Sequence, residues 1–300
     1  MRPVRSLLFV PGHKADWIPK ALRSGADAII IDLEDAVPES DKRLARDNAR
    51  AAIAEHGGDA TILVRTNALD TPHFGADADA VCVEGLAALL LPKIYTRDDL
   101  LRFDGVLTAA EHRNGVPPAT VPVVVSLETA ASVENVGELV RAPRVVGVMG
   151  AAAKGADISR DVGFRWTPAG AETLYLRSKT VTAARSAGLR LIVLGLWQEV
   201  NDLAGLRTFA RDNAGLGFTG QVIIHPSHAA VVNEEYGLTA DQLDYYTRLV
   251  AAFDAAVAEG DAAVRFEGEH IDIAHANYAR QLVRAATAGR GAQDTGEEHP

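Results

Sequence analysis

The most regular feature of the chain is a series of short apolar runs that are rich in leucine and β-branched residues. They occupy residues 6–10, 28–32, 62–66, 89–92, 123–127, 145–149, 191–195 and 222–226. The runs are apolar throughout and do not alternate with polar residues, which is typical of strands buried on both faces of a sheet. We therefore expect eight buried strands.

The segments between these runs have apolar residues at every third or fourth position, the period of an amphipathic helix. The predicted helices are Lys14–Ser24, Lys42–Glu55, Arg97–Arg113, Ser132–Val140, Ala171–Ala187 and Asp202–Asn213. Eightfold strand–helix alternation predicts an α/β fold, a (β/α)₈ TIM barrel, with residues 1–235 as the catalytic domain. A doubly wound open sheet is the alternative that the pattern alone leaves open.

The pattern changes after the eighth run. A long helix is predicted over Asp241–Glu259, a short strand pair within 262–272 and another helix over Ile273–Ala286. We interpret residues 236–287 as a helical C-terminal extension, a lid or subunit-contact segment with a hinge near Gly260. Residues 288–300 are polar, glycine-containing and acidic, so we predict a disordered tail there.

Composition and charge exclude several functional classes. The 300 residues are 48% hydrophobic, enough for a large core, and carry a formal net charge of −10, which disfavours nucleic acid as a partner. The single cysteine, Cys82, rules out an internal disulfide and is expected in the core. Neither a signal peptide nor a membrane-spanning run is found, so we expect a cytoplasmic protein without a membrane partner.

Reactive side chains follow the predicted strands, where barrel loops converge on one face. The alternative is that these charges only reflect the general polarity of loops. The residues are Asp32, Glu34 and Asp35 after the second strand, Arg65 and Asn67 after the third, Lys93 after the fourth, Glu128 after the fifth, Asp157 after the sixth, Gln198 after the seventh and His225 after the eighth.

Several phrases around these residues occur in a known order. RSLLFVPG, DLEDAV, VRTN, LPK, SLET and GFTGQVIIHP, followed by VNEEYGLT and GEHID, cover roughly residues 5–285. The order of these phrases along the chain resembles that of the citrate lyase β-subunit, malyl-CoA lyase and HpcH/HpaI aldolase family. The resemblance implies a TIM-barrel carbon–carbon lyase that acts on an acyl-CoA or a 2-oxo acid.

The resemblance also implies a divalent metal, Mg²⁺ or alternatively Mn²⁺, held by Glu128 and Asp157. Two carboxylates with water and substrate oxygens suit Mg²⁺, a hard ion that prefers oxygen ligands. The alternatives are that Glu128 caps the helix near Ser132 and that Asp157 caps a turn. Asp161 is a rival ligand because the intervening segment is longer than in many relatives.

Arg65 resembles the family arginine that contacts a substrate carboxylate or an enolate oxygen, and its planar fork suits that task. A salt bridge from Arg65 to Glu34 is the alternative. A strand would send Asp32 and Glu34 to the same side, and such crowded acids need a compensating charge. We predict that both acids support Arg65 and the metal-bound waters.

Two lysines are candidates for cofactor binding. Lys14 lies where relatives carry a basic residue near CoA phosphate, and Lys93 could supply charge to the acids or be an exposed rim lysine. Asp272 resembles an acid–base aspartate of the C-terminal segment, acting in cis or from a neighbouring subunit, and its alternative is a helix cap. By resemblance we expect a homotrimer or homohexamer, and we give His225 a structural role.

The predicted reaction is the Mg²⁺-dependent cleavage or formation of a β-hydroxyacyl-CoA, such as malyl-, citramalyl- or citryl-CoA, through a thioester enolate. The alternatives are an aldolase for free 2-oxo-4-hydroxy acids and a citrate lyase β subunit that depends on a carrier protein. Five residues depart from the common family pattern and leave the substrate open: Trp197, Gln198, Gln221, His228 and Tyr236.

Overall fold

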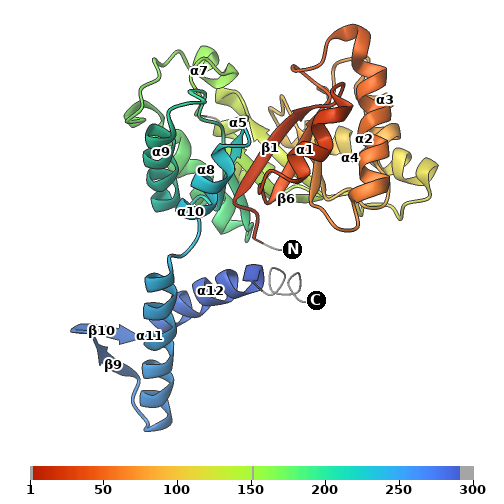
Figure 1. Ribbon diagram of the computed structural model, residues 1–300. Helices are drawn as coiled ribbons and strands as arrows, with labels where there is room; N and C mark the ends of the chain where they lie inside the picture. The colour runs from red at the N-terminus through yellow and green to blue at the C-terminus, as the bar shows by residue number, and fades with distance from the viewer. Residues whose placement is uncertain (1–2, 151, 291–300) are drawn as a thin grey trace, which may run out of the picture. The chain divides into compact units, whose positions relative to one another are not determined.

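The structure is a computed structural model that describes residues 3–150 and 152–290, and its first unit is a closed barrel of parallel strands (Figure 1). Each strand pairs with the next, and β1 closes the ring by pairing with β8, which excludes the open sheet. The predicted TIM barrel is confirmed. The strands are β1 (Ser6–Pro11), β2 (Ala28–Asp32), β3 (Ile62–Arg65), β4 (Ala88–Leu91), β5 (Val123–Leu127), β6 (Val145–Gly150), β7 (Leu191–Leu194) and β8 (Gly220–Ile223).

The helices surround this sheet and differ from the predicted ones in four places. The segment predicted as one helix over Ser132–Val140 starts earlier and breaks at Asn135. In addition, α3, α7 and α10 were not predicted. The α-helices of this unit are α1 (Ile18–Leu22), α2 (Lys42–His56), α3 (Phe74–Val81), α4 (Arg97–Asn114), α5 (Ala130–Glu134), α6 (Val136–Leu139), α7 (Asp157–Val162), α8 (Leu174–Ser186), α9 (Leu203–Leu216) and α10 (His228–Glu235).

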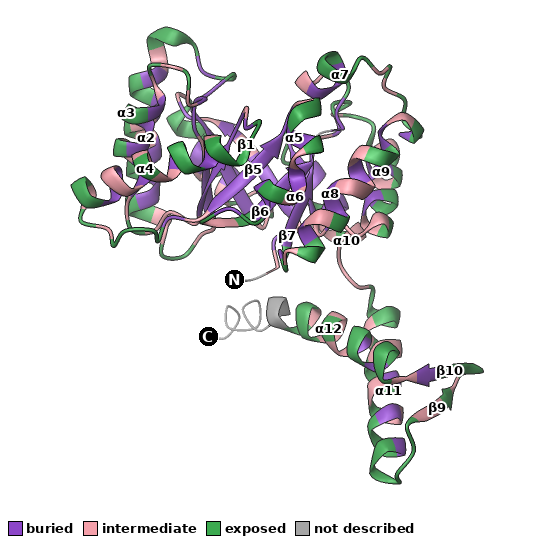
Figure 2. Ribbon diagram, turned by 180° about the vertical axis from the view of Figure 1, so that it is seen from behind, coloured by how far each residue is buried: buried purple, intermediate pink, exposed green. Residues whose placement is uncertain are grey.

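Alternate strand residues pack into two separate apolar clusters, so the strands are buried on both faces (Figure 2). One cluster is the barrel interior and includes Ile30, Leu63 and Val124. The other includes Ile31 and helix residues such as Phe103. Because side chains alternate along a strand, Asp32 and Arg65 continue the interior rows begun by Ile30 and Leu63.

The end of β1 is in direct contact with the end of β2. The Gly12 amide donates to the Asp32 carbonyl at 2.8 Å, and a Cβ atom at Gly12 would come within 2.8 Å of the same oxygen. In addition, Asp32 is level with Arg65 in the register between β2 and β3. The barrel itself therefore places the aspartate beside the arginine.

A second compact unit begins at Gly237, after the barrel unit Val4–Tyr236. It contains α11 (Ala240–Ala258), β9 (Ala263–Phe266), β10 (Glu269–Asp272) and α12 (Ile273–Arg290) around a small core that includes Phe253 and Ile271. The predicted strand pair is an antiparallel hairpin. The predicted tail lies, from residue 291 on, outside the described residues. None of the helices in the described ranges combines the length and the apolar composition that a membrane span requires.

Candidate functional site

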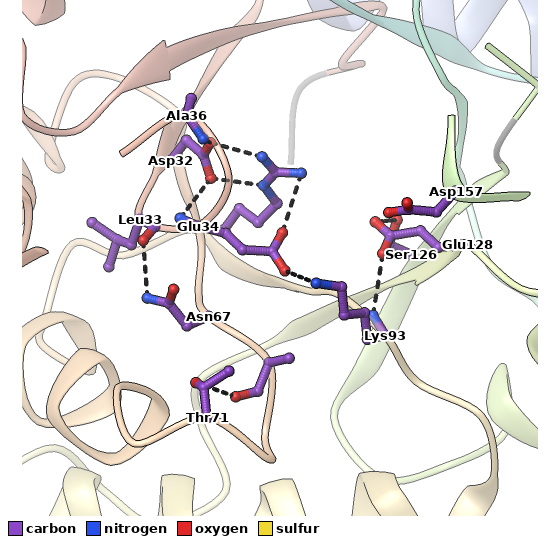
Figure 3. Close-up of polar contacts among 12 residues, drawn as sticks. Asp32, Leu33, Glu34, Ala36, Asn67, Thr71, Lys93, Ser126, Glu128 and Asp157 are labelled. Atoms are coloured by element: carbon purple, nitrogen blue, oxygen red, sulfur yellow. Dashed lines mark hydrogen bonds and ion pairs between the residues drawn. The ribbon is translucent and has the colours of Figure 1, made fainter. Parts of the chain in front are cut away.

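The centre of the site is an ion pair between Arg65 and Asp32 at the carboxyl ends of β3 and β2. Arg65 donates from Nε to Asp32 Oδ1 and from Nη2 to Oδ2, each at 2.7 Å. Asp32 also accepts from the amides of Glu34 and Ala36, both at 3.0 Å (Figure 3). Burial raises the pKa of Asp32, but Arg65 and these amides outweigh it and hold the pKa below its usual value.

Glu34 is the second acid beside the guanidinium. Its Oε2 lies 3.4 Å from Arg65 Nη1, and its Oε1 lies 3.2 Å from Lys93 Nζ. Burial is the largest influence and raises the pKa of Glu34 to about 7, because the two cations do not fully offset it and Glu128 adds repulsion. Lys93 therefore supplies the compensating charge considered from the sequence, although its side chain is 39% exposed.

Glu128 is buried where the interior row of β5 reaches the barrel mouth. It accepts from Ser126 Oγ at 2.8 Å and from the Lys93 amide at 3.3 Å. The pKa of Glu128 is raised, above all by burial and further by the charge of Asp157, although Ser126, Arg65 and the Lys93 amide lower it. It does not cap α5, because Thr129 and Ser132 form a reciprocal capping box there.

Asp157 is the first residue of α7, and its carboxylate faces that of Glu128 (Figure 3). It makes an ion pair with Arg160 one turn later. The rival Asp161 instead accepts from the Ala130 amide at the start of α5 at 2.6 Å. No group of three or more potential metal-ligating side chains occurs among residues 3–150 and 152–290. The facing carboxylates that could hold a cation at this point are those of Glu128 and Asp157.

An apolar cavity of about 600 Å³ opens beside this centre. Arg65 lies at its wall, with the guanidinium carbon 4.8 Å from the centre of the Phe9 ring. Phe9, Trp17 and Lys20 are among the lining residues that were not predicted from the sequence, although the helical spacing of Trp17 and Lys20 signalled that they share a face. Lys14 is exposed and does not line this cavity.

Two further predicted positions have local roles. His225 lines the cavity, and its Nδ1 lies 2.8 Å from Ser227 Oγ. Trp197 is buried against Trp166 and Phe209, with ring centroids 5.7 and 5.6 Å away, and Gln198 is exposed. The unusual tryptophan therefore packs in the core beside the loop that follows β6.

Asp272 lies in the second unit, at the end of β10. Its carboxylate accepts from the Ala274 amide at 2.9 Å and lies 2.6 Å from His275 Nδ1. The His275 hydrogen bond is the main cause that lowers the pKa of Asp272. The residue thus has the contacts of a helix cap for α12, the alternative raised from the sequence. Its side chain is 46% exposed, and its carboxylate is anionic near neutral pH.

The closed barrel and the acids at the ends of its strands define the class of protein. It is a (β/α)₈ enzyme whose site combines carboxylates with an arginine. The HpcH/HpaI aldolase/citrate lyase family profile matches residues 5–226. A citrate lyase subunit beta-like protein of Deinococcus radiodurans is 34% identical, with 93% of this chain and 96% of that protein covered. The chain belongs to this family, as the sequence predicted, and is an enzyme of its carbon–carbon lyase type.

Other relatives differ in the reaction named. A (3S)-malyl-CoA thioesterase and an L-malyl-CoA/beta-methylmalyl-CoA lyase of Cereibacter sphaeroides are each 31% identical, with 95% of this chain and of each relative covered. The crystal structure of CitE from Mycobacterium tuberculosis with magnesium, acetoacetate and coenzyme A has a TM-score of 0.75 at 28% identity, covering 96% of this chain and 100% of that one. The names of the two enzymes refer to CoA esters, and the CitE crystal contains coenzyme A.

Proposed function

We propose that the protein is a Mg²⁺-dependent lyase that cleaves a β-hydroxyacyl-CoA into an acyl-CoA and a 2-oxo acid, or joins them. The observation that carries the proposal is the pairing at one barrel mouth of a fixed guanidinium, Arg65, with two facing carboxylates, Glu128 and Asp157. Arg65 would pair with the carboxylate of a 2-oxo acid, and a metal ion held by Glu128 and Asp157 would polarise its keto group.

The donor set fits Mg²⁺. Glu128 and Asp157 are hard oxygen donors, and their mutual repulsion would be relieved by a divalent cation between them. Two protein ligands leave coordination positions for water and for substrate oxygens. When bound, the ion would act as a Lewis acid toward the keto oxygen of the 2-oxo acid.

Side chains of this protein would bind the substrate and transfer the proton. Arg65, held in place by Asp32, would bind the substrate carboxylate or the developing enolate oxygen with a rigid fork. Glu34 and Lys93 would add an acidic and a basic group beside this guanidinium.

The reaction itself is a retro-aldol cleavage. A base removes the hydroxyl proton and the carbon–carbon bond breaks. The electron pair of that bond becomes the thioester enolate, which then takes up a proton. Asp272 is the proposed acid–base group because its carboxylate is anionic and its side chain is 46% exposed.

The apolar cavity is the proposed place for the CoA arm. Phe9, Trp17 and Ile224 offer apolar walls for the pantetheine chain, and Lys20 at the same wall offers a cation to the phosphates. Lys14 lies one turn before Trp17 and could add a second cation at the surface.

We further propose that the protein forms a homotrimer or a homohexamer. Light scattering of the purified protein would test this.

The test is a parallel assay of the purified chain with Mg²⁺ on malyl-, citramalyl- and citryl-CoA and on a free 2-oxo-4-hydroxy acid, measuring released oxo acid and free thiol separately. Lyase activity releases oxo acid and leaves the thioester intact. Free thiol without oxo acid would instead show hydrolysis, the reaction named for the thioesterase relative. Cleavage of the free acid alone would show an aldolase, and activity only after addition of an acyl-carrier protein would show a carrier-dependent subunit.

A further inference from the structure

Lys42, the first residue of α2, is buried and its ammonium group is fully engaged with the barrel. Nζ donates three hydrogen bonds of 2.7 Å each, to the carbonyl oxygens of Leu33 and Glu34 and to Asn67 Oδ1. An ammonium group has three donors, so none is left for solvent or another ligand. The contacts form a tripod on the segment that follows β2.

This buried charge has no carboxylate counterion among the residues that the structure describes. Among the described residues, Lys42 makes no ion pair with Asp or Glu, and its partners are carbonyl dipoles. Burial of an unpaired cation is costly, and a cation in the first turn of a helix also opposes the helix dipole. Neither α2 nor the core gains from a lysine at this position, which indicates a role in holding its partners.

The partners are tied to the active-site acids. The Leu33 and Glu34 peptide units carry the chain from Asp32 to the Glu34 side chain, the two carboxylates beside Arg65. Asn67 extends the tripod, because its Nδ2 donates to the Leu33 carbonyl at 2.9 Å and to Asp77 at 2.7 Å.

The Glu34 side chain has room to move if this segment loosens. A second cavity of about 510 Å³ lies beside it and is lined by Glu34, Lys42, Asn67 and Lys93, among others. Packing alone therefore does not fix the Glu34 carboxylate against Arg65. The backbone of the segment must be held by hydrogen bonds.

We propose that Lys42 is a positioning residue that holds the Leu33–Glu34 segment so that Glu34 and Asp32 stay directed at Arg65. The effect of Lys42 on turnover rests on the proposed function. The geometric part, the place of Glu34 beside Arg65, stands or falls independently of the substrate.

The test uses Lys42→Met, with Arg43→Met on the exposed side of the same helix as the matched control. Misplacement of a reacting group by about 1 Å costs on the order of 100-fold, so Lys42→Met should lower kcat by about that factor with little change in KM. Arg43→Met should match the wild type. In a double-mutant cycle, Lys42→Met should cost far less when Glu34 is already glutamine.

A crystal structure of Lys42→Met supplies a readout that needs no activity. The expected result is a Glu34 carboxylate displaced into the second cavity and out of contact with Arg65. If the wild type lacks lyase activity, the proposed function fails while this readout still decides the role of Lys42. Should Lys42→Met not fold, Lys42→Arg takes its place, because a planar guanidinium cannot direct three donors to these three acceptors. Wild-type kinetics with Glu34 still beside Arg65 in the folded variant would overturn the proposal.

Discussion

The Arg65 guanidinium and the Asp32 carboxylate meet in a two-pronged ion pair, with both bonds at 2.7 Å and the aspartate side chain only 1% exposed. Each carboxylate oxygen of Asp32 accepts one hydrogen bond from Arg65 and one from a backbone amide of the following loop. Nη1 of the arginine is directed instead at Glu34. The pair therefore fixes the guanidinium as a rigid group at the barrel mouth.

Replacing this arginine tests the rigid fork. Arg65→Lys keeps the charge but loses the two parallel bonds to Asp32, so kcat/KM should fall by about 100- to 1000-fold, as when one donor to a developing oxyanion is removed. Steady-state kinetics with the CoA thioester and Mg²⁺ measure the effect. Arg43→Lys on the solvent side of α2 is the control and should be silent. A loss below tenfold for Arg65→Lys would argue against direct contact with the reacting oxygens.

The metal site is tested at Glu128. Glu128→Gln should abolish Mg²⁺-dependent turnover and leave the thermal unfolding temperature nearly unchanged, because the amide keeps the volume of the buried side chain. Calorimetric titration with Mg²⁺ and pyruvate gives a second measurement. Asp161→Asn is the control, since Asp161 contacts the start of α5. Unchanged turnover in Glu128→Gln would remove the metal from this position.

The raised pKa of Glu34 predicts a pH dependence of stability. The pKa of this carboxyl is near 4.5 in the unfolded chain and about 7 in the folded protein, so between these two pH values the folded state binds more protons. The free energy of unfolding then falls as the pH rises through this window, by at most about 1.4 kcal/mol per pH unit. Urea unfolding in EDTA should show this slope in the wild type relative to Glu34→Gln. Parallel curves for the two proteins would contradict the raised pKa.

The close approach of β1 and β2 makes Gly12 sensitive to substitution. Gly12→Ala places a Cβ 2.8 Å from the Asp32 carbonyl oxygen and 3.0 Å from Ala45 Cβ, so it should destabilise the fold by about 1–3 kcal/mol and lower activity by shifting Asp32. Gly58→Ala, where nothing lies within 4 Å, is the matched control. Urea unfolding measures both, and equal stabilities would show that the strand ends can separate freely.

The role of Asp272 is tested by loss of function and by mixing. Asp272→Asn should lower kcat by about 100- to 10,000-fold if the carboxylate is the acid–base group, whereas Asp261→Asn in a nearby exposed turn should not. Mixed oligomers of Asp272→Asn and Glu128→Gln subunits should regain activity if Asp272 acts on a neighbouring subunit. Inactive mixtures would place it on its own barrel, and a fully active Asp272→Asn variant would leave it only the cap of α12.

The local sequence determined the elements of this protein and the residues at their ends. The runs 28–32 and 62–66 are apolar up to the aspartate and the arginine that end their strands, so the rest of each run has no polar face to expose and is expected to form a strand covered on both sides. The order of polar residues after those runs then predicted which face carries the site. The break at Asn135 and the short helix α7 were not predictable, because tertiary packing sets the ends of such short helices.

Only the tertiary structure decided which of these residues meet. Closure of the barrel brings Asp32 level with Arg65 and lets Asp157 face Glu128, while Asp161 is bound at the start of α5. The sequence did not predict the three buried hydrogen bonds of Lys42, because a lysine at the start of a helix is expected to lie at the surface. The physical reason is that periodicity encodes which face of an element is buried, whereas register and packing between distant elements determine which side chain each buried group contacts.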